Sequence, residues 1–463
     1  MSLMVSVSGI RGIVGESFTP PTIMRYIQGF VRETGKKRGS FLIGRDTRKS
    51  GPAVERIVEG TITSLGYDVT NIGVAPTPTV LFCTRKLGCL GGIAITASHN
   101  GPQWNALKLC NDRGLFLDEE SMGRVEELSA QLIAEQEATV SWEKNENIGS
   151  VTFDRKAHAL HIDEVLRFID TARIRERKFR VAIDPVGGSG TAVDMDFLNR
   201  LGCTVVGVHD RPQGTFPRGP EPTPENLEDL CDLVRAQDAD IGFAQDPDGD
   251  RLSVVSEEGC AVGEEYTLVL AGESYLRHRK TDIVCNLSTS MMVDDLAHRF
   301  GVDVKRTKIG EINVTKGLLE HGASFGGEGN GGVIVTTVNP CRDSLVGMAL
   351  ILDLLAESGK TASEITGEIP SYAMKKQKLD LGSLKKERLY ERLCIKAKNI
   401  FNNFELNTLD GIKLYTDREW VHMRFSNTEP VMRIMAESGS AQRTDELIST
   451  GKSIIASLEV ESS

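Results

Sequence analysis

The sequence predicts three similar mixed-sheet α/β domains followed by a smaller C-terminal α+β domain. First, 463 residues are too many for one hydrophobic core, because single cores stop growing at roughly 250–300 residues. Second, short apolar runs alternate with amphipathic helical stretches, which is typical of βαβ units whose sheets are covered by helices. Third, the end of the chain has a different order, with a helix, several strands and a final helix.

The expected strands are short apolar runs, most of which stop at a cluster of Gly, Asp, Ser or Asn. In the first three domains the clearest of them lie at 41–44, 92–95, 180–183, 240–243 and 282–285. In the last domain they lie at 413–415, 420–425 and 431–436. Ligands of open α/β sheets bind where strands end, so the residues directly after these strands are the first candidates for a functional site.

Three breaks in composition divide the chain. They are a polar, acidic stretch at 134–150, a Glu-Glu-Gly turn at 257–259 and a second turn-forming stretch at 367–371. The predicted domains are therefore 1–150, 151–257, 258–368 and 369–463.

Charge limits the classes of partner that the protein can bind. Lys and Arg number 54 and Asp and Glu number 65, which gives a net charge of −11. A chain this acidic is a poor binder of nucleic acid. It can still bind an anionic small molecule through a local cluster of Arg and Lys, so we expect a small-molecule ligand and no nucleic acid.

Cysteine usage and hydropathy indicate a cytoplasmic protein. Nine cysteines are scattered without a CxxC pair, which favours free thiols in a reducing compartment over disulfides or a structural zinc site. The first nine residues lack the basic and apolar regions of a signal peptide. The longest apolar run, 345–355, contains Asp353 and is too short to span a bilayer, so no membrane association is expected.

A serine follows the expected strand 92–95, in the stretch Thr96-Ala97-Ser98-His99-Asn100. Small neighbours leave the Ser98 hydroxyl accessible, and Gly101-Pro102 favours a turn. This loop is not the Gly-x-Ser-x-Gly elbow of hydrolases, because Thr and Asn stand in place of the glycines. Considered alone, it is most simply an ordinary turn.

Three aspartates follow the expected strand 240–243, at alternate positions of the stretch 246–251, Asp-Pro-Asp-Gly-Asp-Arg. Asp246, Asp248 and Asp250 can converge on one hard cation, and their mutual repulsion has to be offset in some way. With Glu257 they also match four positions of an EF-hand loop, but Arg251 stands where that loop requires Gly. Mg²⁺ that takes a phosphate as a further ligand suits the pattern better.

Two further loops carry polar groups suited to a phosphorylated sugar. The glycine-rich stretch 326–332 contains Glu328 and Asn330, which can hydrogen-bond to hydroxyl groups, although a flexible hairpin is an equally good interpretation. The last loop carries a set of donors that can clamp a phosphate, with a capped turn and surface arginines as the simpler alternative. These donors are Arg424, Ser426, Asn427, Thr428 and Arg433.

In their order along the chain, these four loops resemble the α-D-phosphohexomutase family over the whole sequence. The stretch 246–251 is highly specific, and Ser-Gly-Ile-Arg-Gly at 8–12 and Gly-Arg-Asp-Thr-Arg at 44–48 also match. The resemblance implies four domains around one deep central cleft. It also implies an isomerase that moves a phosphoryl group between the 6- and 1-positions of a hexose through a 1,6-bisphosphate.

The resemblance assigns roles to particular residues. Ser98 is the expected phosphoserine, and Ser98, Asp246, Asp248 and Asp250 are the expected ligands of Mg²⁺. The other expected catalytic residues lie near the reacting centre and are Arg11, His99, Lys108 and Arg251. Glu328 and Asn330 are expected to contact the sugar, and the residues of the last loop to bind the phosphate that is not being transferred.

The glycine-rich stretch 326–332, called the sugar loop below, favours a hexosamine as the substrate. Gly332 stands where many mannose- and glucose-phosphate mutases have His, and the loop resembles that of archaeal-type phosphoglucosamine mutases, as does the stretch 5–12. Gly101 before Pro102 and Ala106 after Asn105 depart from the usual family pattern.

A phosphoglucomutase/phosphomannomutase, an inactive sugar-phosphate sensor and a simple phosphatase remain alternatives. The oligomeric state is expected to be monomer or homodimer.

The remaining conspicuous residues are not expected to belong to the site. Histidines outside the serine loop show no ligand spacing with carboxylates, so we expect them to pack or to lie on the surface. The basic run 375–386 is expected to be a solvated face or a linker.

Overall fold

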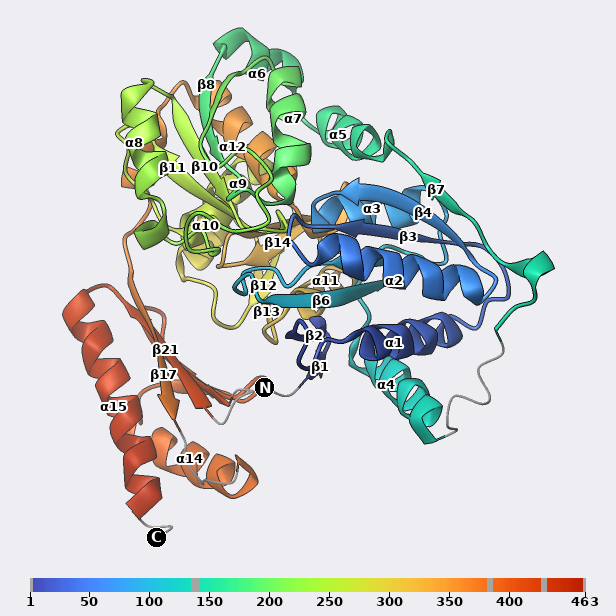
Figure 1. Ribbon diagram of the computed structural model, residues 1–463. Coiled ribbons are helices and arrows are strands. Elements are labelled where there is room, and N and C mark those ends of the chain that lie inside the picture. The colour runs from blue at the N-terminus through green and yellow to red at the C-terminus, as the bar shows by residue number, and fades with distance from the viewer. Residues whose placement is uncertain (1–2, 135–141, 381–385, 426–430, 461–463) are drawn as a thin grey trace.

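The computed structural model describes residues 3–134, 142–380, 386–425 and 431–460. Within these ranges the strands form four separate sheets, each with helices packed against it, and the fourth sheet lies apart from the other three (Figure 1). The first three sheets mix parallel and antiparallel pairs and the fourth is antiparallel. Three α/β domains and a C-terminal α+β domain are therefore confirmed. No helix of the described ranges is both long and apolar enough to cross a membrane.

The first sheet belongs to domain I. In spatial order its strands are β1 (Met4–Ser6), β2 (Gly9–Ile13), β6 (Trp104–Asn111), β5 (Gly91–Ile95), β3 (Ser40–Arg45), β4 (Asp68–Val74) and β7 (Val151–Phe153). Its helices are α1 (Pro20–Glu33), α2 (Gly51–Ser64), α3 (Thr77–Lys86) and α4 (Glu119–Ala134). Because β7 completes this sheet, domain I extends slightly beyond residue 150, where we expected it to end.

Alternation along the strands places helices on both faces of this sheet. Phe41 and Ile43 pack in one core with α1, α2 and α4, whereas Leu42 packs on the opposite face with α3. Proline at the first or second position starts α1, α2 and α3, where its missing N–H costs no hydrogen bond. Strands buried on both faces explain why the expected strands are almost wholly apolar.

Domain II has a smaller sheet, with strands β11 (Leu252–Ser256), β10 (Ile241–Gln245), β8 (Arg180–Asp184) and β9 (Thr204–Gly207) in spatial order. Its helices are α5 (Ala157–Phe168), α6 (Thr171–Arg177), α7 (Asp194–Arg200) and α8 (Glu228–Ala236). Short 3₁₀ turns occur at Asn145–Asn147, Ser189–Ala192 and Pro224–Asn226.

Domain III shares one continuous hydrophobic core with domain II. Its strands are β13 (Val304–Thr307), β12 (Ile283–Asn286), β14 (Phe325–Glu328), β15 (Gly332–Val335) and β16 (Asn339–Arg342). Its helices are α9 (Glu264–His278), α10 (Met292–Phe300), α11 (Glu311–His321), α12 (Ser344–Ser358) and α13 (Ala362–Gly367).

Domain IV is an antiparallel sheet with helices on one face. Its strands are β17 (Ala373–Asp380), β21 (Val431–Ser438), β20 (Trp420–Phe425), β19 (Ile412–Tyr415) and β18 (Glu405–Asn407), and its helices are α14 (Lys386–Ile400) and α15 (Ala441–Val460). Met432, Ile434 and Ala436 of β21 are buried in the helix-side core, which leaves Arg433 and Glu437 on the opposite, polar face.

The hairpin interpretation of the glycine-rich stretch is confirmed, because β14 continues to Glu328 and pairs it with Gly332. A Cβ on Gly326 would lie 2.1 Å from the backbone oxygen of Val284, so only glycine admits such close strands there. The basic run is not a linker in its first half, since residues 373–380 form β17 and pair with β21.

One buried polar network joins the first three domains. Asp343 accepts a hydrogen bond from His161 Nε2 at 2.7 Å, and His161 Nδ1 lies 3.0 Å from the Thr79 hydroxyl. Asp343 also caps α12 by accepting hydrogen bonds from the backbone of Leu345 and Val346. His161 is thus a packing residue, as expected, although it does contact a carboxylate.

We expect Asp343→Ala to lower the free energy of unfolding by about 3–5 kcal/mol, because it leaves His161 and the start of α12 without their buried partner. Denaturant unfolding followed by circular dichroism measures this loss. Asp163→Ala, which removes a partly exposed ion pair with Arg200, is the control and should cost less than about 1 kcal/mol. Equal losses in the two variants would contradict the assignment.

Candidate active site

Ser98 lies just past the end of β5, in a strained backbone conformation. Its φ angle is +47°, in the left-handed region that non-glycine residues seldom adopt. The side chain is 3% exposed, and its Oγ donates a hydrogen bond to Asp246 Oδ2 at 2.8 Å. The expected serine loop therefore meets the expected aspartate loop directly.

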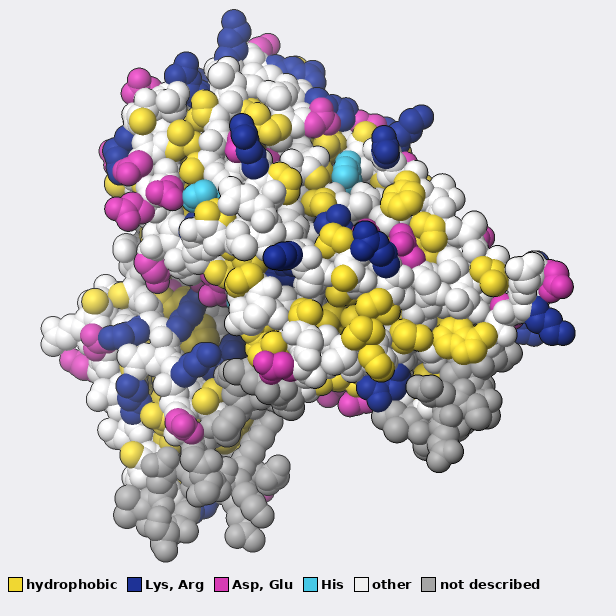
Figure 2. All heavy atoms as spheres, in the orientation of Figure 1, with side chains coloured by type: hydrophobic (Ala, Val, Ile, Leu, Met, Phe, Trp, Pro, Cys, Tyr) yellow, Lys and Arg dark blue, Asp and Glu magenta, His cyan; other side chains and the backbone are white. Residues whose placement is uncertain are grey.

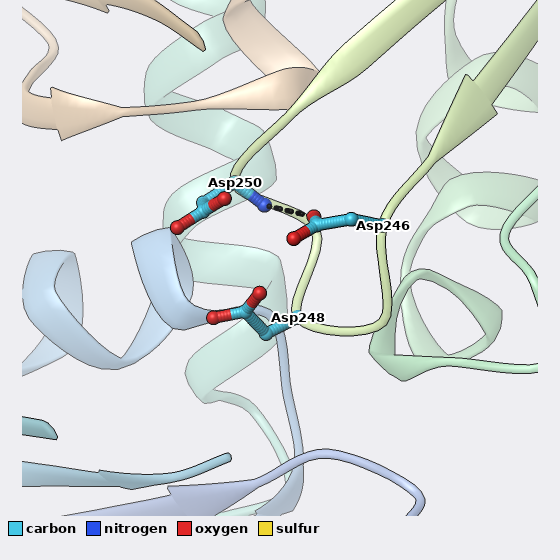
Figure 3. Close-up of side chains that lie close together, drawn as sticks. All are labelled: Asp246, Asp248 and Asp250. Atoms are coloured by element: carbon cyan, nitrogen blue, oxygen red, sulfur yellow. Dashed lines mark hydrogen bonds between the residues drawn. The ribbon is translucent and has the colours of Figure 1, made fainter. Parts of the chain in front are cut away.

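The three aspartates form one buried cluster between β10 and β11 (Figure 3). Each contributes an oxygen to a group whose atoms all lie within 4.8 Å of one another. Asp246 Oδ1 accepts hydrogen bonds from the backbone of Asp250 and Arg251, both at 3.2 Å. Glu257 is not part of the cluster and accepts a hydrogen bond from Ser363, which disfavours the EF-hand alternative.

Two oxygens of this cluster show that it is incomplete as a purely protein network. Among the described residues, none donates a hydrogen bond to Asp248 Oδ1 or Asp250 Oδ1, although both atoms are buried. Unpaired buried carboxylate oxygens are costly. Three converging carboxylates with unsatisfied oxygens are a donor set that fits a hard divalent cation.

Cationic side chains from two other domains offset part of the negative charge. Lys108 on β6 places its Nζ 2.5 Å from Asp248 Oδ2 and 3.3 Å from Asp250 Oδ2. Arg342 at the end of β16 donates to Asp250 at 2.6 Å, and the Thr77 hydroxyl donates to Asp248 at 2.7 Å. Domains I and III thus both contribute contacts to the aspartate loop of domain II.

The pKa values of Asp246 and Asp248 shift in opposite directions. Burial, followed by the charges of Asp250 and Asp248, raises the pKa of Asp246 well above its usual range. Burial also acts to raise the pKa of Asp248, but Lys108 and several hydrogen bonds outweigh it and hold that pKa below its usual range. Lys108 itself is buried, which favours its neutral form, yet Asp248 and Asp250 raise its pKa above normal, so its charge is retained.

A cleft of about 300 Å³ is lined by residues of all four domains, among them His99, which follows Ser98 in the chain, and Arg251, which follows Asp250. Lys and Arg side chains gather along the hollow between domain IV and the rest of the molecule (Figure 2). The predicted site residues that line the cleft are His99, Arg251, Glu328, Asn330, Arg424 and Arg433.

His99 and Arg251 form the wall beside Ser98. Arg251 Nη2 donates to His99 Nδ1 at 3.0 Å, and Arg251 Nη1 pairs with Glu221 at 2.9 Å. Burial, with Arg251 and Arg11 close by, lowers the pKa of His99 to about 2. The imidazole is therefore neutral at physiological pH and accepts through Nδ1. Arg11 on β2 donates to the side chain of Asn100 and so also borders the serine loop.

The sugar loop presents hydrogen-bond acceptors to the cleft. Glu328 is held by three donors, namely Asn286 Nδ2 at 2.8 Å, the Gly310 backbone at 3.0 Å and Arg342 at 2.9 Å. Asn330 Oδ1 is buried and has no hydrogen-bond partner within the described ranges. Asn330 therefore offers an available acceptor, whereas Glu328 is already fixed in place.

Arg424 and Arg433 are directly opposed on neighbouring strands of domain IV. Like charges in opposed cross-strand positions destabilise a sheet, and the ion pair of Arg424 with Asp410 at 2.8 Å offsets only part of this cost. An anion bound between the two guanidinium groups would relieve the repulsion. The other predicted phosphate ligands, Ser426, Asn427 and Thr428, lie outside the described residues.

Several residues of the site had no local signal in the sequence. Arg342 joins Asp250, Glu328 and Glu311, but it stands in no recognisable motif. Glu265, Lys376 and His422 also line the cleft, although the sequence placed Lys376 in a solvated run and His422 outside the site. These residues can be recognised only from the structure, because contacts between elements that are distant in the sequence bring them to the site.

Three mixed α/β domains, a fourth antiparallel domain and one polar cleft shared by all four define an enzyme that acts on a small anionic molecule. Models of the phosphoglucomutase/phosphomannomutase domains match the chain in order: alpha/beta/alpha domain I over 3–136, domain II over 159–259, domain III over 263–372 and the C-terminal domain over 385–449. The chain therefore belongs to the phosphoglucomutase/phosphomannomutase family of α-D-phosphohexomutases and is an isomerase.

Relatives with this architecture span nearly the whole chain. A phosphoglucomutase/phosphomannomutase of Thermococcus kodakarensis is 34% identical over 97% of this chain and 98% of its own. A probable phosphoglucosamine mutase of Methanopyrus kandleri is 33% identical over 96% of both. The solved structure of a putative phosphomannomutase from Thermus thermophilus shares the fold, with a TM-score of 0.82 at 24% identity, over 98% of this chain and 99% of its own.

Adding Mg²⁺ should raise the melting temperature, because a ligand of the folded state alone stabilises it by about 2.7 kcal/mol at 100 times Kd. Asp246→Asn removes one cluster charge and keeps an acceptor for the backbone, so it should abolish most of this shift. Differential scanning calorimetry with Mg²⁺ or with a chelator measures the effect. Asp163→Asn, far from the cluster, should retain the full shift; an undiminished shift in Asp246→Asn would refute the site.

Proposed function

We propose that the protein interconverts glucosamine 6-phosphate and glucosamine 1-phosphate through a phosphoserine at Ser98 and a hexosamine 1,6-bisphosphate. One observation carries this proposal: the Ser98 hydroxyl is hydrogen-bonded to a buried aspartate cluster, and the cleft beside it reaches an arginine pair in domain IV. A reactive phosphate and a binding site for a second phosphate in one cleft are what an exchange between two ends of one sugar requires.

Mg²⁺ is the proposed ion of the aspartate cluster, held by Asp246, Asp248 and Asp250 together with an oxygen of Ser98 or of its phosphate. When bound, it neutralises charge on the phosphoryl group and helps to orient it. An N-acetylphosphoglucosamine mutase of Aspergillus fumigatus that shares this fold was solved with GlcNAc-6P and magnesium, which supports the choice of ion.

Side chains of the protein would position the reacting groups and offset the negative charge of the phosphoryl group. Phosphoryl transfer depends mainly on these two effects. Lys108 stays protonated beside the cluster, and Arg11 and Arg251 add positive charge at the serine loop. As the bond between the Ser98 oxygen and phosphorus breaks, a sugar hydroxyl oxygen forms the new bond to phosphorus and gives up its proton. The electron pair of the broken bond stays on Ser98 Oγ, which takes up a proton and returns to the hydroxyl that donates to Asp246.

The fourth domain would hold the phosphate that is not being transferred. Arg424 and Arg433 supply paired guanidinium groups on adjacent strands, a geometry that suits a phosphate dianion. The bisphosphate has to exchange its two ends between this pair and Ser98. A cleft that residues of all four domains line can hold the bisphosphate while its two ends change places.

Carboxylates in the cleft favour an amino sugar. Glu264 and Glu265 at the start of α9 face the same cleft as the sugar loop, and Glu265 Oε2 lies 1.8 Å from the position of a Cβ on Gly329. This carboxylate therefore packs directly over the sugar loop. Burial raises the pKa of Glu265 to about 8, against the opposing effect of Lys376. A 2-ammonium group would favour the ionised carboxylate and so gain more from this neighbour than a 2-hydroxyl does. Curated relatives named probable phosphoglucosamine mutases agree with this choice.

The alternative within the family is a phosphoglucomutase/phosphomannomutase, the name given to the relative from Thermococcus kodakarensis. Both alternatives share Ser98, the metal and the arginine pair. They differ only in which sugar gives the highest kcat/KM.

Ser98→Ala should lose nearly all mutase activity while its folding stays intact, because the phosphoryl carrier is absent. Mass spectrometry of the purified wild type should show a fraction heavier by one phosphoryl group, which peptide mapping assigns to Ser98. Ser253→Ala, which changes a buried serine on β11, is the control and should retain activity. Activity of Ser98→Ala near the wild-type value would eliminate the phosphoserine route.

Wild-type kcat/KM should be highest for glucosamine 6-phosphate when it is compared with glucose and mannose 6-phosphates. Glu265→Gln should lower the value for glucosamine 6-phosphate by about 10–100-fold, the effect of losing one charged hydrogen bond of roughly 1.5–3 kcal/mol. The glucose 6-phosphate value should change little. Glu257→Gln is the matched control, because the Glu257 carboxylate lies outside the cleft and accepts a hydrogen bond from the Ser363 backbone. An equal loss for both sugars would remove Glu265 from amine recognition.

A further inference from the structure

A closed ring of hydrogen bonds fixes the backbone of Ser98 from both sides. The Ser98 N–H donates to Thr96 Oγ1 at 3.0 Å, and the Thr96 hydroxyl donates to Asp46 Oδ2 at 2.7 Å. The same Asp46 oxygen accepts from Arg48 Nε at 2.9 Å, and Arg48 Nη2 donates to the Ser98 carbonyl at 2.6 Å. The amide and the carbonyl of Ser98 are thus tied to one buried ion pair.

Arg48 uses every N–H of its guanidinium group on this loop. Besides Asp46 and the Ser98 carbonyl, it donates to the carbonyls of Asn100 at 2.7 Å, Gly101 at 2.6 Å and Trp104 at 3.0 Å. Five donors therefore meet five acceptors, four of them backbone carbonyls within seven residues of chain. The rigid planar fork of arginine can do this, whereas lysine has three donors on a single nitrogen.

The surroundings prevent Arg48 from taking another position. Its side chain is completely buried, and the Phe216 ring from domain II lies 4.8 Å from its guanidinium carbon. The neighbouring Thr47 hydroxyl donates to the Gly187 carbonyl of domain II at 2.7 Å. The domain that carries the aspartate cluster therefore also covers the residue that shapes the serine loop.

We propose that Arg48 is a positioning residue, which holds Ser98 in its left-handed conformation so that Oγ faces Asp246. A serine in this conformation is strained and needs its surroundings to maintain it. Released from Arg48, residues 98–104 would relax, and Oγ would move away from the aspartate cluster. This proposal rests on the proposed function, because it assumes that Ser98 carries the phosphoryl group.

Arg48→Lys tests the proposal in the full-length protein. Misplacing a reacting group by about 1 Å can cost on the order of 100-fold in rate, so we expect kcat to fall at least about that much. KM for the sugar phosphate should change less than about threefold, because the arginine pair and the sugar loop are untouched. Phosphorylation of Ser98 by a hexose 1,6-bisphosphate, followed by intact mass, should slow in parallel with kcat.

Two milder variants keep the test decisive if Arg48→Lys folds poorly. Phe216→Leu removes the ring over the guanidinium, and Asp46→Asn removes its counter-ion but keeps an acceptor for Thr96. Both should lower kcat with KM nearly unchanged, by less than Arg48→Lys does. Circular dichroism and thermal unfolding establish that each variant is folded.

Arg279→Lys is the matched control, because Arg279 also donates to a backbone carbonyl, that of Phe168, and stacks on aromatic rings, but does so away from the cleft. It should retain wild-type kcat. A folded Arg48→Lys with wild-type kcat overturns this inference, as does a folded Phe216→Leu or Asp46→Asn without any change. A wild type that shows no mutase activity, or an active Ser98→Ala, overturns the proposed function instead.

Discussion

Repulsion among three buried carboxylates is the constraint on which the rest of the structure depends. Asp246, Asp248 and Asp250 lie within one short loop of domain II, out of contact with solvent. The groups that compensate them come from elsewhere, with Lys108 on a strand of domain I and Arg342 on a strand of domain III. Domains I–III are thus held together at the site by charge as well as by their apolar cores, and the residual negative charge is left for a cation.

The two walls of the cleft differ in how firmly hydrogen bonds and ion pairs hold their arginine side chains. On the serine side, Arg48 and Arg251 each donate hydrogen bonds to several fixed partners. On the domain IV side, Arg424 and Arg433 face one another as like charges. The first wall is preorganised for chemistry, which demands exact geometry. The second wall keeps two cationic side chains opposite each other, of which Arg424 pairs with Asp410.

Local sequence patterns predicted the strands, the serine loop and the aspartate loop, because each has a signature within a few residues. The glycine-rich stretch was harder to interpret, since its glycines serve close strand pairing at Gly326 as well as close packing of Glu265 against Gly329. Arg342 and Glu265 could not have been predicted from spacing. Their roles depend on contacts with residues far away in the chain, and nothing in their immediate neighbours marks them.

The separation of the paired strands β17 and β21 along the chain has a consequence for the synthesis of the protein. These strands are adjacent in the fourth sheet but more than fifty residues apart in the chain. As the polypeptide leaves the ribosome, the serine loop, the aspartate loop and the sugar loop can all form before β21 exists. A nascent chain can therefore assemble the aspartate cluster with Lys108 and Arg342 while it still lacks the strand that carries Arg433, so the wall that domain IV gives to the cleft is the last part of it to form.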